Sequence, residues 1–184
     1  PTYQGANPIS DVWATKSLQI VARYLERAVG DADDSEARSQ MLLAATFAGY
    51  GFGNAGCHLP HGMSYPVSSM VAAARAEGGY QAEGYPTDHP LLPHGTSVIL
   101  NSPAVFAFTA LANPRRHLEA AGFLGADTSD VAEEEVGEVL AGRIVELMRA
   151  VAAPSGLAAV GFTEAHIDDL VAGTLPQHRV TKLS

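Results

Sequence analysis

The stretch that decides the fold runs from residue 49 to residue 95 and is rich in glycine and histidine. It begins with G-Y-G-F-G-N-A-G-C-H-L-P-H-G-M-S-Y-P at residues 49–66 and closes with T-D-H-P-L-L-P-H-G at residues 87–95. Four of the seven histidines of the chain fall inside it, namely His58, His61, His89 and His94. The sequence on either side follows helical patterns, so we expect the rest of the chain to hold these imidazoles in place.

The first part of this stretch matches the G-x-G-x-x-G pattern of dinucleotide-binding proteins at residues 51–56. That fingerprint has to follow a strand, open a helix and be followed by an acidic residue about 20 positions later. Here the preceding residues have helical spacing, and about 20 positions after Gly51 the sequence reads V-A-A-A-R-A, with no acidic residue before Glu77. We therefore interpret the glycines as positions where two helices approach each other closely.

Helical periodicity continues on both sides of the stretch. A first helix is expected from Ile9 to Ala28, capped at Ser10-Asp11, and a second from Ser35 into the glycines. Further helices are predicted over residues 61–75, 94–111 with a kink at Pro103, 114–125, 129–151 and 163–171, before an extended tail at 175–184. No alternating apolar pattern predicts a pair of strands. The sequence therefore predicts one all-α domain, a helical bundle over residues 1–184.

The composition excludes several classes of partner. At 184 residues and a formal charge of −9, the chain lacks the clustered Lys and Arg that nucleic-acid binding needs. No apolar run approaches the ~18 residues of a membrane span, so no membrane partner is expected. Cys57 is the only cysteine and cannot form an internal disulfide, which favours a reducing, cytoplasmic location.

Two of the histidines share a local pattern. His61 and His94 each follow a proline, precede a glycine and stand at a predicted helix start. Imidazole is a common ligand of Zn²⁺ and Fe²⁺. A metal site at two helix starts needs anionic ligands elsewhere, because the helix dipole is positive there. The residues alone leave both alternatives open: metal ligands, or ordinary buried or capping histidines.

The other histidines and Cys57 are weaker candidates for a metal ligand or a nucleophile. His58 and His61 have a spacing that could chelate a metal, but Pro60 disturbs the helix between them. Cys57 beside His58 could be a thiol nucleophile, although a thiol among small residues is typical of packing. The other three histidines lie outside the stretch; His117 and His166 are expected to be exposed and His178 to lie in the tail.

The motifs H-L-P-H-G-M-S-Y-P and D-H-P-L-L-P-H-G-T-S-V resemble those of the iron-containing (group III) alcohol dehydrogenases, and most closely the hydroxyacid-oxoacid transhydrogenase branch. The resemblance covers nearly the whole chain. It includes P-T-Y-Q-G-A-N-P-I-S-D near the start, F-A-G-Y-G-F-G-N-A-G in the middle, and G-L-A-A-V-G-F-T and G-T-L-P-Q-H-R-V-T-K-L near the end.

This resemblance implies the C-terminal helical domain of a two-domain enzyme, in which an N-terminal α/β domain binds NAD(P) and a divalent metal lies between the domains. The family holds the metal with one Asp and three His. By motif, His61 and His94 correspond to two of these ligands, and the other two would come from an Asp-x-x-x-His helix upstream of residue 1. Tyr65 stands where many relatives carry a further, non-ligand His, and we expect Tyr65 and His89 to be catalytic or pocket residues.

The implied function is an oxidoreductase that moves hydride between a small alcohol or hydroxy acid and a nicotinamide, with Fe²⁺ or Zn²⁺ polarising the substrate oxygen. The isolated chain is expected to be inactive and to bind metal weakly or not at all, and it could form a homo-oligomer through an exposed face. The alternative is a non-catalytic helical binding or scaffold domain whose histidines only pack. A dehydroquinate synthase or glycerol dehydrogenase relative would share the fold but differ around the two His-Gly motifs.

Overall fold

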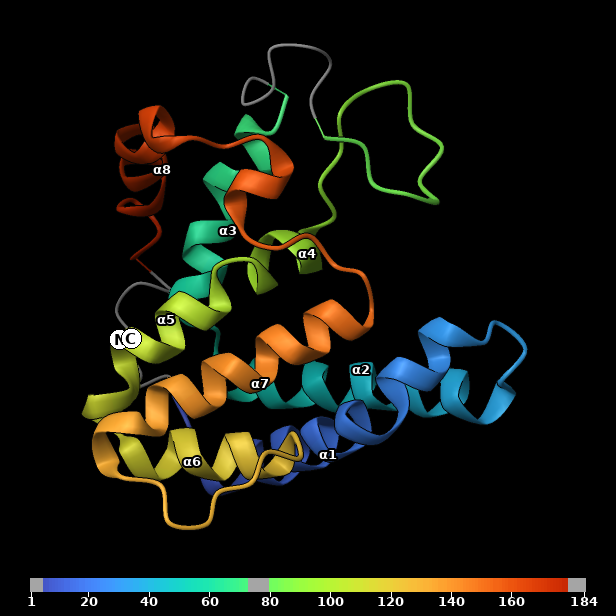
Figure 1. Ribbon diagram of the computed structural model, residues 1–184, viewed down its shortest axis with the longest axis vertical. Helices are drawn as coiled ribbons and strands as arrows, with labels where there is room; N and C mark the ends of the chain where they lie inside the picture. Colours follow the sequence, from blue (N-terminus) through green and yellow to red (C-terminus); the bar gives the residue numbers. More distant parts are fainter. Residues whose placement is uncertain (1–4, 73–79, 179–184) are drawn as a thin grey trace. The chain divides into compact units, whose positions relative to one another are not determined.

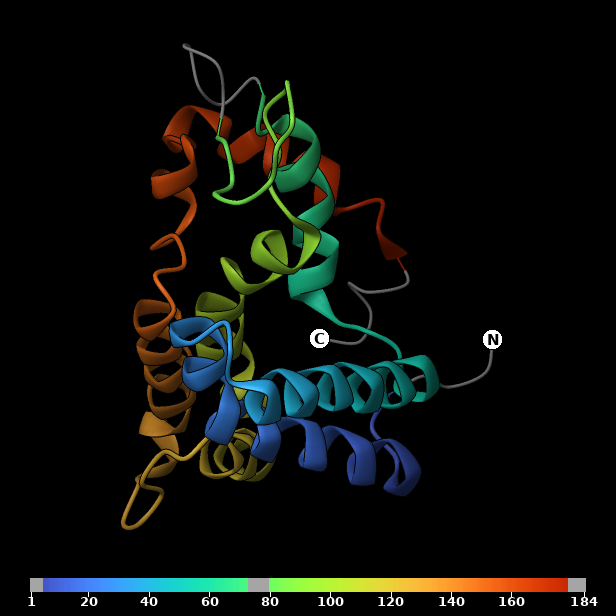
Figure 2. The ribbon, with the colours of Figure 1, turned by 90° about the vertical axis from the view of Figure 1, so that its right-hand side faces the viewer.

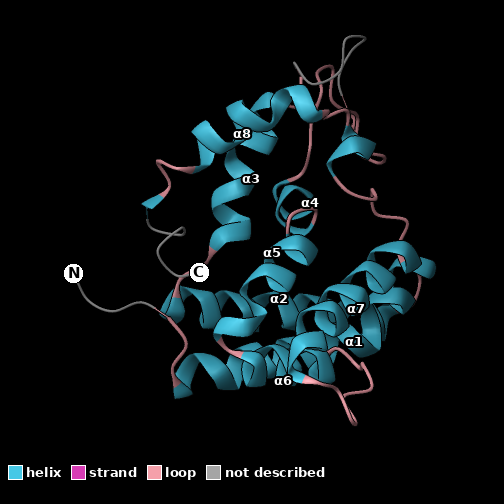
Figure 3. Ribbon diagram, turned by 60° about the vertical axis from the view of Figure 1, so that its left-hand side comes forward, coloured by secondary structure: helices cyan, strands magenta, loops and turns pink. Residues whose placement is uncertain are grey.

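The computed structural model describes residues 5–72 and 80–178, and these ranges contain helices and loops without a strand (Figure 3). Their only β-type pairing is an isolated bridge between Gln81 and Leu91. The chain forms two compact units (Figure 1). The first comprises Pro1–Cys57 and Phe106–Ala152, and the second comprises His58–Val105 and Ala153–Ser184. The all-α class predicted from the sequence is confirmed.

The first unit is built on a hairpin of two long helices, α1 (Pro8–Gly30) and α2 (Ser35–Ala55), which lie side by side (Figure 2). Asn7 caps α1, because its side chain accepts hydrogen bonds from the backbone N–H groups of Ile9 and Ser10. The predicted cap at Ser10-Asp11 is therefore wrong by one turn. Pro8 suits the first helical position, where a backbone N–H is not needed.

Apolar side chains spaced along both helices hold the hairpin together. Its buried core consists of Ile20, Tyr24, Ala37 and Ala44, with Val21, Ala28, Met41 and Phe47 packed against it. Ser17 also crosses between the helices, donating from its hydroxyl to the carbonyl of Ala44 at 2.9 Å. Trp13 of α1 packs on Phe47 and Tyr50 of α2, with ring centroids 5.3 and 5.5 Å away.

The rest of the first unit comes from later in the chain. It contains the end of α5 (Ser102–Thr109), η1 (Ala110–Ala112), α6 (Pro114–Phe123), η2 (Glu133–Glu135) and α7 (Val136–Ala150). An ion pair joins α1 to α6, with Arg116 and Asp11 2.6 Å apart. The approach of α7 to α5 requires a glycine, since a Cβ on Gly137 would lie 2.9 Å from the carbonyl oxygen of Ala107.

The long helix predicted from Ser129-Asp130 begins later than expected. Asp130 has a φ of +55°, a left-handed conformation that cannot start a right-handed helix. Ser129 instead donates to the carboxylate of Asp127 at 2.6 Å. The three glutamates form an exposed 3₁₀ turn, η2, as a solvated face, and the helix proper begins only at Val136.

The second unit contains α3 (Leu59–Met70), α4 (His94–Ile99), η3 (Leu157–Val160), η4 (Glu164–His166) and α8 (Ile167–Thr174). Helix α3 packs against both α4 and α8. Pro66 lies inside α3, and a Cβ on Gly173 of α8 would lie 2.6 Å from its Cβ, so a glycine is needed at this contact. The helix predicted from Thr163 is confirmed, with Thr163 and His166 forming a capping box.

The predicted helix over residues 94–111 is divided in two. The backbone breaks at Leu100 and Asn101, where the Asn101 amide donates to the carbonyl of Ser97 at 2.7 Å. Pro103 does not kink a continuous helix but lies in the first turn of α5, where proline is tolerated.

The segment His94–Ala112 is long and apolar enough to cross a membrane by length and composition alone, as core helices of soluble proteins also are. This corrects the expectation that no segment reaches that length. The expectation missed it because Asn101, Ser102 and Pro103 interrupt the apolar run in the sequence.

Some predictions fall outside the described residues. These are the end of the helix predicted to reach Arg75 and the last part of the predicted tail, residues 179–184. Within the described part, α3 ends at Met70 and α8 at Thr174, followed by a turn at Leu175 and Pro176.

Candidate metal centre

The structure brings together His61 and His94, the two histidines of the P-H-G motifs. Their ring centroids lie 5.2 Å apart, with the ring planes at 65°. His61 is the third residue of α3 and His94 is the first residue of α4, so the packing of these two helices produces the contact. Both residues belong to the same compact unit.

The environment of His61 favours its neutral form. Burial lowers the pKa of His61 below its usual value, and the neighbouring imidazole of His94 lowers it further because two imidazolium charges would repel each other. Only a neutral imidazole offers a lone pair to a metal ion. His61 is therefore in the protonation state that a ligand needs at neutral pH.

Tyr65 lies beside the same pair. Its ring stacks on His94 with a centroid separation of 6.2 Å and an interplanar angle of 27°. It is spaced four residues from His61 on α3, so the two side chains share a face of that helix, as expected. Tyr65 is 46% exposed, which leaves the phenol accessible to a small molecule.

His89 is placed differently. Its side chain is 65% exposed, and its Nδ1 pairs with the carboxylate of Asp88 at 2.9 Å. Its carbonyl accepts a hydrogen bond from the hydroxyl of Thr87 at 2.9 Å. These contacts are all within its own loop and join His89 to neither His61 nor His94.

Three of the other histidines cap a helix or bond to one, and Cys57 lies beside a helix end. His58 occupies the N-cap position of α3, and its carbonyl accepts from the backbone N–H of His61 at 2.9 Å. His117 and His166 are half-buried rather than exposed, because His117 bonds to Thr109 at 3.0 Å and His166 caps its own turn. Cys57 is half-buried just beyond the end of α2.

Two serines that the sequence reasoning missed belong to the same turns as the candidate ligands. Ser64 and Ser97 are fully buried, and each donates from its hydroxyl to the carbonyl of the histidine three residues earlier, at 2.7 Å. The signal that could have found them is the repeated pattern P-H-G-x-S at residues 60–64 and 93–97.

The described residues contain fewer donors than a metal site of this kind needs. Across residues 5–72 and 80–178, no group of three or more His, Cys, Asp or Glu side chains could hold a metal ion. Structural and catalytic sites for zinc use at least three protein ligands. His61 and His94 could therefore supply two nitrogen ligands of a divalent metal site, fewer than the three that such a site needs.

The G-x-G-x-x-G match proves to be the end of a helix. Gly51 and Gly53 lie inside α2, and Gly56 caps its C-terminus with a φ of +85°. A phosphate cradle needs the N-terminal end of a helix, so this geometry excludes the dinucleotide fingerprint. Close helix approach requires a glycine at none of three positions, because a Cβ on Gly51 would make an ordinary contact of 3.5 Å with the backbone of Ala14, and Gly49 and Gly53 have open space around them.

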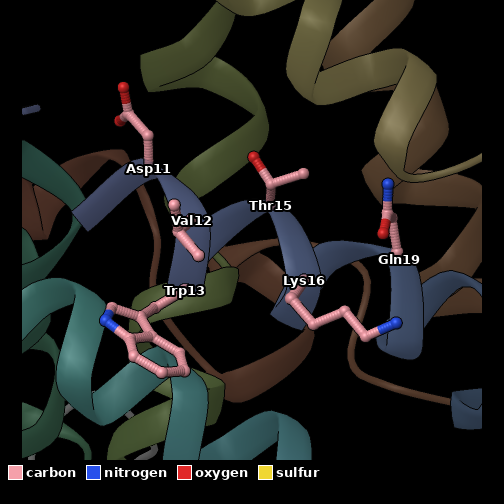
Figure 4. Close-up of a pocket in the computed structure, with 6 residues that line it drawn as sticks. All are labelled: Asp11, Val12, Trp13, Thr15, Lys16 and Gln19. Atoms are coloured by element: carbon pink, nitrogen blue, oxygen red, sulfur yellow. The ribbon is translucent and has the colours of Figure 1, made fainter. Parts of the chain in front are cut away.

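The first unit contains a hollow of about 530 Å³ along one helix, α1 (Figure 4). Its lining residues are Asp11, Val12, Trp13, Thr15, Lys16 and Gln19. Two of them already have partners, since Asp11 pairs with Arg116 and Trp13 packs on Phe47. The hollow has no histidine and no cluster of titratable groups suited to chemistry.

Comparison with known proteins supports the resemblance. A sequence profile described as "Fe-containing alcohol dehydrogenase family, C-terminal" matches residues 2–79. The chain is 57% identical to the mitochondrial hydroxyacid-oxoacid transhydrogenase of Xenopus tropicalis and 55% identical to that of Bos taurus, over all 184 residues in both cases.

Solved structures share the fold. A 1,3-propanediol oxidoreductase superposes with a TM-score of 0.80 over 95% of this chain and 41% of its own, at 22% identity. A sulfoacetaldehyde reductase from Bifidobacterium kashiwanohense, solved in complex with NAD⁺, superposes with a TM-score of 0.71 over 94% of this chain and 39% of its own, at 24% identity.

The names of the relatives correct one prediction. The chain spans 38% of the length of each of these two transhydrogenases. Both are named mitochondrial, which contradicts the cytoplasmic location predicted from the sequence. The prediction rested on Cys57, and a lone cysteine indicates only that no internal disulfide forms; it does not distinguish one compartment from another.

Family profile, relatives and fold agree with one another and with the P-H-G motifs that carry the two histidines. The chain belongs to the iron-containing alcohol dehydrogenase family, as a C-terminal helical part related to hydroxyacid-oxoacid transhydrogenase.

Proposed function

We propose that this chain is the metal-binding C-terminal domain of an oxidoreductase that transfers hydride between a small alcohol or hydroxy acid and a nicotinamide cofactor. The observation that carries the proposal is the contact between His61 and His94. The related transhydrogenases are named for hydroxy acids and oxo acids, which supports this substrate class. Their names also support a mitochondrial location for the whole protein.

The distance between the two rings supports a shared ion. A metal–nitrogen bond of about 2.1 Å puts the centre of an imidazole ring about 3.2 Å from the ion, so two imidazoles at a tetrahedral angle have ring centres about 5 Å apart. The separation of 5.2 Å agrees with that value. Imidazole ligands suit both iron and zinc, and the family description favours iron.

Each residue of this chain has a proposed role. His61 and His94 hold the ion, which when bound supplies Lewis-acid polarisation of the alcohol or carbonyl oxygen. Tyr65 stacks on His94 and limits its rotation, and its accessible phenol is suited to hydrogen-bond with the substrate oxygen or to relay its proton. A pocket role for His89 stays a prediction, since its contacts are with Asp88 and Thr87.

The remaining parts of the enzyme would lie upstream. We infer an N-terminal nucleotide-binding domain, supported by the NAD⁺ complex of the sulfoacetaldehyde reductase and by the 38% of the relatives' length that this chain spans. We also infer that an Asp-x-x-x-His helix supplies the other two ligands. By itself, the described part of the chain would offer His61 and His94 as donors, and we expect the chain alone not to turn over substrate.

The test is hydride transfer by the full-length protein with a panel of small hydroxy acids and alcohols. We expect His61→Ala and His94→Ala each to lower kcat/KM by at least 100-fold, since outer-shell changes alone typically cost 10–100-fold. The control is Ser69→Ala, on the exposed side of α3. Wild-type kcat/KM in both histidine variants would overturn the proposal.

A further inference from the structure

The two candidate ligands lie on the faces of α3 and α4 that pack against each other. On α3, His61, Tyr65 and Ser68 are spaced i, i+4 and i+7 and therefore share one face. On α4, His94 and Ser97 are three residues apart and also share a face. His61 and Tyr65 contact His94, while Ser68 contacts Ser97, so both stripes meet along the same interface.

The hydroxyl groups of Ser68 and Ser97 form two consecutive hydrogen bonds across this interface. Ser68 donates to the hydroxyl oxygen of Ser97 at 2.9 Å, and Ser97 donates to the carbonyl of His94 at 2.7 Å. A serine hydroxyl has one proton, and Ser97 donates its proton to His94, so Ser97 can only accept in its bond with Ser68. The two hydrogen bonds therefore connect Ser68 of α3, through the hydroxyl of Ser97, to the backbone carbonyl of His94.

These serines need an explanation, because alanine is the better helix former and carries no polar atom to bury. Ser64 and Ser97 are fully buried, where a hydroxyl needs a hydrogen-bond partner. Each finds it in the carbonyl of its own histidine, His61 or His94, at the same distance of 2.7 Å. The arrangement recurs at both candidate ligands, and Ser68, one turn after Ser64 on α3, bonds to Ser97 of α4.

We propose that Ser68 and Ser97 are positioning residues of the metal site, whose hydrogen bond between α3 and α4 sets the separation of His61 and His94. Ser64 fixes the corresponding turn of α3. The inference rests on the proposed function, because it assigns His61 and His94 as ligands. Two imidazoles chelate one ion only at a restricted separation, so a looser contact between α3 and α4 would leave the ion with one imidazole.

The test changes Ser68, which can be altered without touching the Ser97–His94 bond. Ser68→Ala removes the link between the helices, and Ser68→Thr keeps a hydroxyl at the same position. Ser69→Ala is the matched control, because Ser69 is the next residue of α3, is exposed, and bonds within its own helix to the carbonyl of Pro66 at 3.1 Å.

Two quantities are measured on each variant of the 184-residue chain. The first is the nuclear Overhauser effect between the rings of His61 and His94 without metal, and the second is the affinity for Zn²⁺ from titration. We expect Ser68→Ala to weaken the ring-to-ring effect and to lower the affinity roughly tenfold. Ser68→Thr and Ser69→Ala should match the wild type in both.

The outcomes separate this inference from the proposed function. A Ser68→Ala variant with the wild-type ring-to-ring effect and Zn²⁺ affinity, even if less stable, would overturn the positioning role. Zn²⁺ binding that survives substitution of both His61 and His94 by alanine would overturn the metal site instead. In that case the ring-to-ring effect, which needs no metal, still decides whether Ser68 sets the separation.

Discussion

The imidazole rings of His61 and His94 lie 5.2 Å apart, although one belongs to the first turn of α3 and the other to the first residue of α4. The contact requires α3 and α4 to pack together, and the hydrogen bond between Ser68 and Ser97 crosses the same interface. The second compact unit therefore places the two candidate metal ligands together through its own packing.

The packing of α7 can be tested at two glycines of the same helix. Gly137→Ala should lower the free energy of unfolding by about 1–3 kcal/mol, because its Cβ would lie 2.9 Å from the carbonyl oxygen of Ala107. Gly142→Ala should raise it by roughly 0.5–1 kcal/mol, because the site is open and alanine favours helix. Urea denaturation measures both. Equal effects at the two sites would contradict the described contact of α7.

The ion pairs at the turn between α1 and α2 predict a pH dependence. Hydrogen bonds from Arg27 lower the pKa of Asp34 and of Glu36 in the folded protein. Lowered carboxyl pKa values stabilise the fold above the ordinary value of about 4, and this stabilisation is lost as the pH falls through the lowered values. Arg27→Met should therefore lower Tm at pH 7, and the difference from the wild type should shrink towards pH 3.

Arg23 provides the control for this prediction. Both arginines lie 5.1 Å from the centre of the Tyr24 ring, but the described ion pairs with Asp34 and Glu36 involve Arg27. Arg23→Met should change Tm by the same amount at pH 7 and at pH 3. If thermal scans give the two variants the same pH profile, the carboxylates do not account for the effect of Arg27.

The fluorescence of Trp13 can report on the packing of α1 against α2. Trp13 is the only tryptophan and packs on Phe47 at 5.3 Å. Phe47→Ala should shift its fluorescence to longer wavelength, because the indole becomes more hydrated. Phe47→Ala should also lower the free energy of unfolding by on the order of 2 kcal/mol, less than the 3–5 kcal/mol typical of fully buried phenylalanines. Phe52→Ala on the exposed side of α2 should leave the emission maximum unchanged; a matching shift there would argue against the Trp13–Phe47 contact.

Most of the fold could be predicted from the sequence because local signals agreed with it. Helical spacing predicted α1 over Ile9 to Ala28, although its cap at Asn7 was missed, and it carries α2 into its glycines. The start of α7 could not be predicted, since Ser129 and Asp130 read as a cap while the backbone at Asp130 is left-handed. The break after Leu100 was also missed, because it depends on a bond from Asn101 to Ser97.

The candidate site could be predicted only in part. The repeated P-H-G motif identified His61 and His94, but their contact is long-range and follows from the packing of α3 on α4. His117 was expected to be exposed, yet its partner Thr109 lies in α5, which periodicity does not reveal. Ser68 and Ser97 gave no signal as a pair, since hydroxyl groups acquire a role only through the neighbours that the fold provides.

The most direct test of the metal site is a histidine-resolved NMR titration of this chain with Zn²⁺, in which the ring resonances of all histidines are followed separately. We predict that those of His61 and His94 shift first and with one common midpoint, while exposed His89 follows only at higher Zn²⁺ concentration. Resonances of His61 and His94 that stay unmoved while other histidines shift, or that shift with different midpoints, would contradict a shared metal site.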